Sequence, residues 1–200
     1  GGVGKTTTVI NLASALSQQG KKILVIDLDP QGNATTGLGL SNTESSDETI
    51  YGILNGTKNI SKVIKKTKFK NLDLISSNVD LSGLEVETAG DSDRAFILKS
   101  KLEAYLNDSR GSYDYILIDC PPSLSLLTVM ALVSSDSLLV PLQTEFFALE
   151  GLTQLMKTIE RIKVNLNPEL KIRGILLTMF DKRNRLSTPV SYTHLRAHET

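Results

Sequence analysis

The residues that most constrain this chain are its first seven, Gly1-Gly2-Val3-Gly4-Lys5-Thr6-Thr7. Glycines at these positions allow the backbone to curl so that successive N–H groups point at one anion. A lysine placed after them reaches the β- and γ-phosphates of a nucleotide, and the next threonine hydroxyl binds Mg²⁺. The usual phosphate-loop pattern has its first glycine two positions before Gly1, so the match is partial. A loop without a ligand is the alternative, but such a loop would not need Lys5.

An amphipathic helix is predicted directly after this loop. Apolar residues recur at helical spacing at Val9, Leu12 and Leu16, and Gly20 is a suitable cap, so we expect a helix over residues 5–19. The positive end of its dipole adds to an anion site at the loop. Loop and helix together predict binding of a nucleotide with Mg²⁺.

Apolar β-branched runs alternate with helical patterns along the remaining sequence. We expect strands at residues 23–27, 72–76, 115–119, 137–142 and 172–179, and helices at 93–107, 124–133 and 148–164. Residues 32–56 are rich in Gly, Asn, Thr and Ser, and we expect them to run over the surface with a short helix at 49–54. The alternation predicts an α/β fold with a doubly wound, mostly parallel sheet flanked by helices.

Composition narrows the class of protein. The 200 residues are 40% hydrophobic, which suits one globular domain, and we place it at residues 1–187. With 22 basic and 22 acidic residues the net charge is zero, so any binding to nucleic acid or membrane must use a local patch. No apolar stretch is long enough to cross a bilayer. Cys120 is the single cysteine, which excludes an internal disulfide and favours a cytoplasmic location.

Acidic residues end two of the predicted strands, at the sheet edge where α/β proteins bind ligands. Asp119 closes an apolar strand of Walker-B form, and we expect it beside Mg²⁺, acting through the water shell of the ion. Asp27 and Asp29 are two residues apart, which places both carboxylates on one side of an extended backbone. We assign Asp29 to the attacking water and Asp27 to the metal or Lys5. A helix cap at Asp119 and an ordinary Asp-Pro turn at Asp29 are the alternatives.

Residues 49–72 contain no acidic side chain but six lysines. This basic run could contact phosphates of a nucleic acid, or it could form the solvated face of a helix. Its lysines are Lys58, Lys62, Lys65, Lys66, Lys68 and Lys70.

The end of the chain differs from the rest. Residues 188–200 have neither periodicity nor an apolar face, and they contain both histidines, His194 and His198. Their i, i+4 spacing suits a metal on a helix, but no third ligand is evident. The string also resembles translated adaptor sequence, so we expect a non-native tail after Ser187.

Four strings give the chain a family resemblance. Besides the opening loop, they are Asp-Leu-Asp-Pro-Gln-Gly-Asn at 27–33, Asp-Cys-Pro-Pro-Ser at 119–123 and Pro-Leu-Gln-Thr-Glu-Phe-Phe-Ala-Leu-Glu-Gly at 141–151. Over residues 1 to about 187 the chain resembles the ParA/Soj chromosome- and plasmid-partition ATPases, which have a three-layer P-loop NTPase fold. The last string discriminates best, because MinD and nitrogenase iron proteins share the loop.

The resemblance implies an ATP-hydrolysing switch. It implies a homodimer in the ATP state that binds DNA without sequence preference, associates with the nucleoid and responds to a ParB-type partner. The family has a signature lysine immediately before the position of Gly1, and further sequence after the position of Ser187. On that pattern we expect a fragment, truncated at both ends, with weak nucleotide binding and weak or no ATPase activity.

Two other functions remain open from the residues. A membrane-cycling positioning ATPase of MinD type requires a C-terminal amphipathic helix, which these 200 residues do not contain. An iron–sulfur carrier requires cysteine ligands, and one Cys120 per chain is a poor match.

Overall fold

The computed structural model describes residues 2–41, 43, 45–108, 112–143 and 148–179. Contacts between residues divide the chain into two compact units, which are described separately. The larger unit spans residues 6–134, and the smaller combines residues 1–5 with the chain from 135 onward. The assignment of residues 1–187 to one domain stays a prediction. Residues 188–200, with both histidines, lie outside the described residues.

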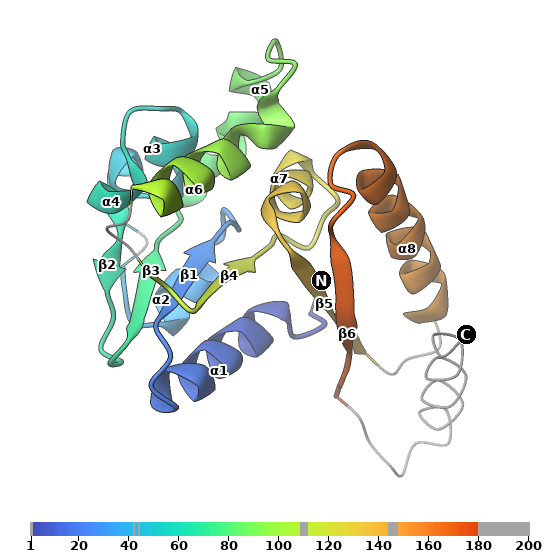
Figure 1. The fold of residues 1–200 in the computed structure, drawn as a ribbon, viewed down its shortest axis with the longest axis horizontal. Coiled ribbons are helices and arrows are strands. Elements are labelled where there is room, and N and C mark those ends of the chain that lie inside the picture. The colour runs from blue at the N-terminus through green and yellow to red at the C-terminus, as the bar shows by residue number, and fades with distance from the viewer. Residues whose placement is uncertain (1, 42, 44, 109–111, 144–147, 180–200) are drawn as a thin grey trace. The chain divides into compact units, whose positions relative to one another are not determined.

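A four-stranded sheet forms the centre of the larger unit. Its strand order is β2-β3-β1-β4, and Figure 1 shows the strands side by side. The three long strands are parallel, and β2 pairs antiparallel with β3 at the edge. The bounds are Ile23–Asp27 for β1, Lys65–Lys66 for β2, Leu72–Ile75 for β3 and Tyr115–Asp119 for β4. All five residues of β1 are buried, as expected for a central strand of apolar β-branched residues.

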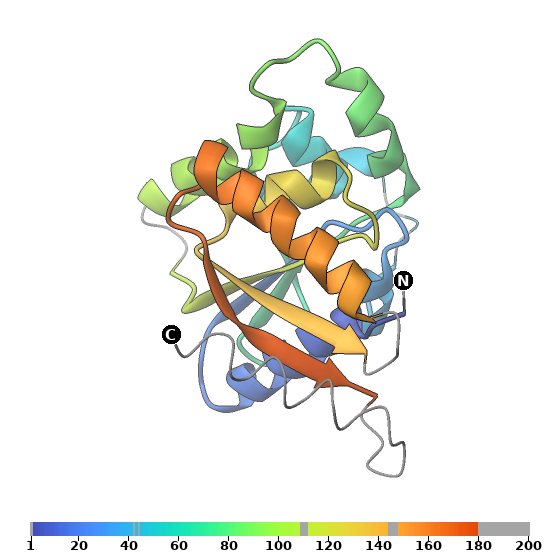
Figure 2. The same ribbon diagram turned by 90° about the vertical axis from the view of Figure 1, so that its right-hand side faces the viewer.

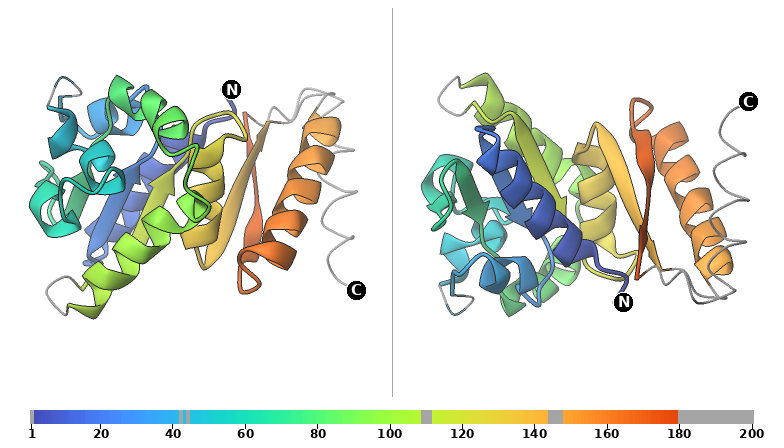
Figure 3. Two further views of the ribbon diagram at one scale, coloured as in Figure 1. Left: turned by 90° about the horizontal axis from the view of Figure 1, so that it is seen from above. Right: turned by 90° about the horizontal axis from the view of Figure 1, so that it is seen from below.

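Helices cover both faces of this sheet. Successive side chains of β1 point to opposite faces of the sheet. Val25 packs with Ala13 of α1, whereas Ile26 packs in a second cluster with Ile53. Figures 1 and 3 show α1 on one side and α3, α4 and α6 on the other. The bounds are Lys5–Gln18 for α1, Ile50–Leu54 for α3, Ile60–Val63 for α4, Ile97–Asn107 for α6 and Leu126–Ser134 for α7. The predicted three-layer α/β architecture is confirmed.

The segment between Gly32 and Gly56 differs from its prediction. We expected it to run over the surface, but Thr35, Ile50 and Ile53 are fully buried. These side chains point into the core because the segment forms three short helical elements. They are α2 (Asn33–Gly37), the 3₁₀ turn Ser46–Glu48 and α3. The expected short helix is present, with Thr49 as its N-cap, because the Thr49 hydroxyl accepts a hydrogen bond from the Tyr51 amide at 3.3 Å.

Short helical turns also connect β3 to α6. They comprise the 3₁₀ turn Val79–Gly83, α5 (Leu84–Glu87) and the 3₁₀ turn Arg94–Phe96. The helix predicted over residues 93–107 therefore begins as a 3₁₀ turn and continues as α6. The chain in this region packs against the sheet through buried residues such as Leu81 and Leu84.

The smaller unit is a parallel strand pair with a crossover helix. Strand β5 (Ser137–Gln143) pairs with β6 (Lys171–Thr178), and α8 (Ala148–Asn165) connects them (Figure 2). Leu152 and Met156 of α8 pack on Val140 and Leu142 of β5. At the other end of α8, the Asn167 side-chain amide donates to the Ser135 carbonyl at 2.8 Å. No helix in the described ranges is both long and apolar enough to span a membrane.

Substitution of Gly52 in α3 tests how closely this helix packs against the chain that precedes it. A Cβ atom added to Gly52 would lie 2.2 Å from the carbonyl oxygen of Asp47, so Gly52→Ala must displace backbone. We expect a loss of about 1–3 kcal/mol in the free energy of unfolding, measured with urea. Gly90→Ala is the control, because no heavy atom lies within 4 Å of its added Cβ. Equal stabilities of the two variants would contradict this packing.

Candidate functional site

The glycine loop has the backbone geometry that its sequence predicts. Gly2 and Gly4 both have left-handed backbones, with φ of 84° and 83°, and side chains other than glycine rarely adopt such values. A Cβ on Gly4 would meet Thr178 at an ordinary 3.6 Å, so the requirement for glycine comes from φ rather than from space. Gly1 lies outside the described residues. Left-handed residues in such a loop help successive N–H groups to converge on an anion.

The loop is tied to the strand pair of the smaller unit. The hydroxyl of Thr178, the last residue of β6, donates a hydrogen bond to the Val3 carbonyl at 2.9 Å. Helix α1 then begins at Lys5, so Thr6 and Thr7 lie in its first turn, which contains no acidic residue. An ammonium group, two hydroxyls and a helix N-terminus are donors that fit a polyphosphate with Mg²⁺.

The predicted acidic residues meet at one edge of the larger unit's sheet. Asp27 and Asp119 are the last residues of the neighbouring strands β1 and β4 and are paired in register. The Leu28 amide donates to the Asp119 carbonyl at 2.9 Å, which extends this pairing beyond the strands. The exposed fractions are 0% for Asp27, 6% for Asp29 and 1% for Asp119. Three carboxyl groups therefore lie buried at the carboxyl ends of parallel strands.

The Asp27 carboxylate is held by the chain that follows it. Its Oδ2 atom accepts hydrogen bonds from the amide and the hydroxyl of Thr35, both at 2.7 Å. Its Oδ1 atom accepts from the Asp29 amide at 3.2 Å. Burial raises the pKa of Asp27, and the hydrogen bonds from Thr35 and Asp29 offset part of this rise. Asp27 thus anchors residues 28–35 to the end of β1.

Thr35 links a third strand end to this arrangement. Its hydroxyl oxygen also accepts a hydrogen bond from the Ser77 amide at 3.0 Å, just beyond the end of β3. The Ser77 hydroxyl is itself fully buried and has no hydrogen-bond partner among the described residues. The sequence pattern does not single out Thr35, because its Gly-Asn-Ala-Thr-Thr run is typical of surface loops. The sequence feature that points to Thr35 is the polar run that follows the strand ending at Asp27.

Asp29 lies in the turn that follows β1. Its Oδ1 atom accepts a hydrogen bond from the Gln31 amide at 3.0 Å, which is the Asx turn expected for an Asp-Pro sequence. Asp29 is nevertheless buried, unlike most aspartates in turns. In the described part of the chain, no three histidine, cysteine, aspartate or glutamate side chains form a cluster suited to a metal ion. Mg²⁺ does not need such a cluster, because it binds through one or two protein oxygens, phosphates and water.

The Thr35 hydroxyl provides a direct test of this arrangement. Thr35→Val keeps the shape of the side chain but leaves the buried Ser77 amide without its acceptor and removes one donor to Asp27. We expect a loss of about 1–3 kcal/mol in the free energy of unfolding, measured with urea. Thr36→Val is the matched control, because its hydroxyl is exposed and bonds only to nearby carbonyls. A Thr35→Val protein as stable as the control would show that the link carries no stability.

The chain is similar to one family model and to several known proteins. The family model described as "AAA domain" matches residues 1–172. Over 198 residues the chain is 51% identical to the chromosome partitioning protein ParA of Caulobacter vibrioides, covering 99% of this chain and 73% of that protein. Over 190 residues it is 46% identical to the sporulation initiation inhibitor protein Soj of Bacillus subtilis, covering 95% of this chain and 73% of Soj.

A solved structure supports the same fold. The chain matches cobyrinic acid a,c-diamide synthase from Mycobacterium smegmatis, crystallised with a bound ATP analog and magnesium. The TM-score is 0.86 at 36% identity, over 96% of this chain and 76% of that chain. The family model matches residues 1–172, and the chain covers 73% of the length of both ParA and Soj. The chain therefore belongs to the ParA/Soj family of P-loop partition ATPases.

Proposed function

We propose that this protein binds and hydrolyses ATP as a switch for chromosome or plasmid partition. The observation that carries the proposal is the group of buried carboxylates at the strand ends, in a chain that opens with a phosphate loop. The identity of 51% to a chromosome partitioning protein supports the partition role. The diamide synthase named above shares 36% identity, and we give it less weight for function.

We propose that the opening loop binds the phosphates. The backbone N–H groups of the loop and the N-terminus of α1 would hold the anion, and the Lys5 ammonium would reach the β- and γ-phosphates. The Thr6 hydroxyl would hold Mg²⁺ directly, and Asp119 would hold it through water. Bound Mg²⁺ supplies charge neutralisation on the phosphate oxygens.

We propose different tasks for the two carboxylates that follow β1. Asp27 would serve Mg²⁺ or Lys5 mainly through the turn that it holds, because both of its oxygens already accept hydrogen bonds. Asp29 positions the attacking water. Gln31 engages only its Oδ1 atom, and Oδ2 accepts no hydrogen bond from the described residues, so Oδ2 is available to orient a water. Burial of Asp29 limits its contact with bulk solvent.

We further propose that the switch follows the family pattern. The ATP state is a homodimer that binds DNA without sequence preference on the nucleoid, and a ParB-type partner stimulates hydrolysis. The support is the likeness to ParA and Soj over nearly the whole chain. A MinD-type positioning ATPase on a membrane is the alternative. ATP-dependent binding to lipid vesicles, with no binding to DNA, would favour that alternative.

Two substitutions separate phosphate binding from the chemical step. In the full-length protein, Lys5→Ala removes the cation on the phosphates and should abolish ATP binding in equilibrium titrations with a fluorescent ATP analog. Asp29→Ala should leave that affinity within a few-fold and lower the rate of phosphate release by about 100-fold. The protein should then accumulate in its ATP state.

Asp91→Ala is the matched control for Asp29. Asp91 also accepts a hydrogen bond from the amide two residues later, at 2.8 Å from Asp93, but it lies in an exposed turn. Its loss should leave binding and turnover at wild-type values. Equal loss of ATP binding in the Lys5 and Asp29 variants would contradict the separate roles, as would an Asp29 variant with normal turnover.

A further inference from the structure

The edge of the sheet opposite the acidic strand ends contains a hollow lined by lysines. Its walls come from the residues that precede β1, β3 and β4 and from the turn between β2 and β3. It has a volume of about 570 Å³, and the cations that line it are Lys22, Lys66, Lys68 and Lys70. The alternative that the basic run forms one helical face is wrong for the described structure, because only Lys62 of its six lysines lies in a helix.

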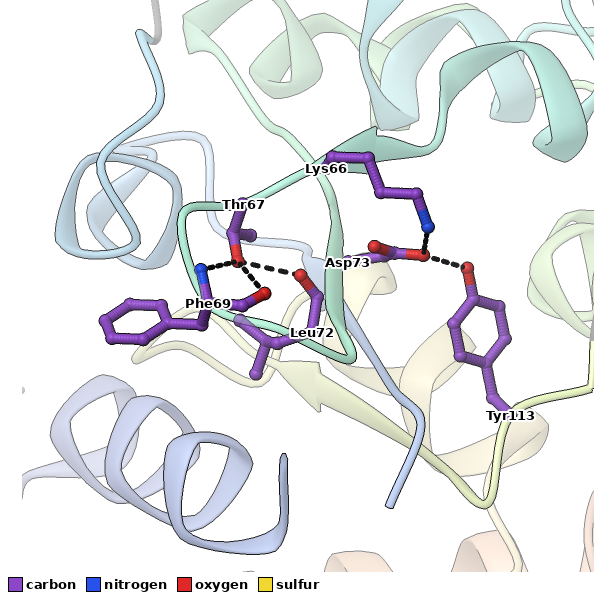
Figure 4. A network of polar contacts seen from close by, with 6 residues as sticks. All are labelled: Lys66, Thr67, Phe69, Leu72, Asp73 and Tyr113. Atoms are coloured by element: carbon purple, nitrogen blue, oxygen red, sulfur yellow. Dashed lines mark hydrogen bonds and ion pairs between the residues drawn. The ribbon is translucent and has the colours of Figure 1, made fainter. Parts of the chain in front are cut away.

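The turn of the β2–β3 hairpin beside this hollow is held by hydrogen bonds of the Thr67 hydroxyl (Figure 4). The Thr67 hydroxyl donates to the Leu72 carbonyl at 2.7 Å and accepts from the Phe69 amide at 3.1 Å. Asn71 completes the turn with a left-handed backbone, φ 62°. Phe69 packs against the core beside α1, so the lysines on either side of it are presented from a fixed turn.

The floor of the hollow is already satisfied by protein groups. Asp73 is 6% exposed and accepts hydrogen bonds from the Lys66 ammonium at 2.7 Å and from the Tyr113 hydroxyl at 2.8 Å (Figure 4). Burial, together with the bond to Asp73, raises the pKa of the Tyr113 phenol, which keeps it a donor. The floor therefore offers few free groups to recognise a small molecule.

The cations at the rim remain exposed. The Lys68 ammonium lies 5.3 Å from the centre of the Phe69 ring, and Lys70 and Lys22 are open to solvent. Asp114, just before β4, pairs with the Lys21 ammonium at 3.8 Å and accepts a hydrogen bond from the Lys22 amide at 2.7 Å. Four lysines and one aspartate, Asp73, stand among the residues that line the hollow, so this lining has a net positive charge in a chain with no net charge.

We propose that this lysine-rimmed edge binds the phosphodiester backbone of DNA. The inference rests on the proposed function and adds a contact surface to it. Exposed lysine ammonium groups on flexible side chains can contact successive phosphates of a nucleic acid backbone without recognising the base sequence. Pockets that bind small molecules are, in contrast, mainly apolar. A second hollow of about 270 Å³ shares Phe69, Lys70 and Asn71 and continues to the end of α1. This continuity favours an extended ligand over a compact one.

The test measures DNA binding by the full-length protein with ATP and Mg²⁺. Labelled 30-base-pair duplexes of two unrelated sequences are titrated at several NaCl concentrations and followed by fluorescence anisotropy. The Lys68→Ala/Lys70→Ala double variant should bind both duplexes about tenfold more weakly. Its slope of log affinity against log salt should be shallower by about 2, because each lost phosphate contact contributes about 0.9. ATP affinity should be unchanged.

Two further variants separate position from charge. Lys68→Arg/Lys70→Arg keeps the cations and should bind as the wild type does. Lys62→Ala/Lys157→Ala removes two exposed lysines that do not line either hollow, and it should have a smaller effect. Equal losses in the two alanine variants would overturn the assignment of this edge.

The remaining outcomes distinguish this inference from the proposed function. Wild-type DNA binding that Lys68→Ala/Lys70→Ala leaves unchanged overturns this inference and leaves the partition switch standing. A variant that loses affinity only for inorganic phosphate, with DNA binding intact, also overturns it. A wild-type protein that binds neither duplex in any nucleotide state refutes both.

Discussion

The buried carboxylate of Asp27 is the group on which the arrangement of this protein's strand ends depends. A carboxylate with 0% exposure is costly unless several donors surround it, and here the donors come from Thr35 and Asp29. The same Thr35 hydroxyl accepts from the Ser77 amide, so the ends of β1 and β3 are joined. On the other side, the Leu28 amide joins β1 to β4 at Asp119. Asp27 and the residue after it therefore connect the ends of three strands.

This arrangement explains why the turn after β1 can be both irregular and well defined. Residues 28–35 leave the sheet, yet the amides of Asp29, Gln31 and Thr35 donate hydrogen bonds to the side chains of Asp27 and Asp29. Asp29 is held in a buried turn and not on a free loop. Such positioning is what a residue that orients water requires, since errors of an ångström in placement lower rates strongly.

The two edges of the sheet differ in chemistry. Carboxyl groups gather where the parallel strands end, and lysines gather where they begin. Asp27, Asp29 and Asp119 are buried, and the Asp27 and Asp29 carboxylates accept hydrogen bonds from the chain that follows, whereas most of the lysines are exposed. On the proposals above, nucleotide chemistry and electrostatic contact with DNA would use opposite edges of this sheet, in a chain with zero net charge.

The strands and long helices were predictable because their patterns reflect burial directly. The apolar runs at Ile23–Asp27 and Tyr115–Asp119 matched β1 and β4 to the residue, and they placed Asp27 and Asp119 at one edge. Thr35 was not predictable in the same way. Its burial depends on a bond to Asp27 and on the approach of Ser77, 42 residues later, and neither contact has a local pattern. The lysine run was misleading for a related reason, because hairpin pairing with β3 overrides its helix-like composition.

The central proposal is that this protein binds ATP with Mg²⁺. An NMR titration of the isotopically labelled full-length protein with a non-hydrolysable ATP analog and Mg²⁺ tests it most directly. We predict that the amides of Gly2 and Gly4 and those of Leu28 and Thr35 shift together, with a single dissociation constant. Shifts confined to the loop, with Leu28 and Thr35 unmoved at saturation, would contradict the account.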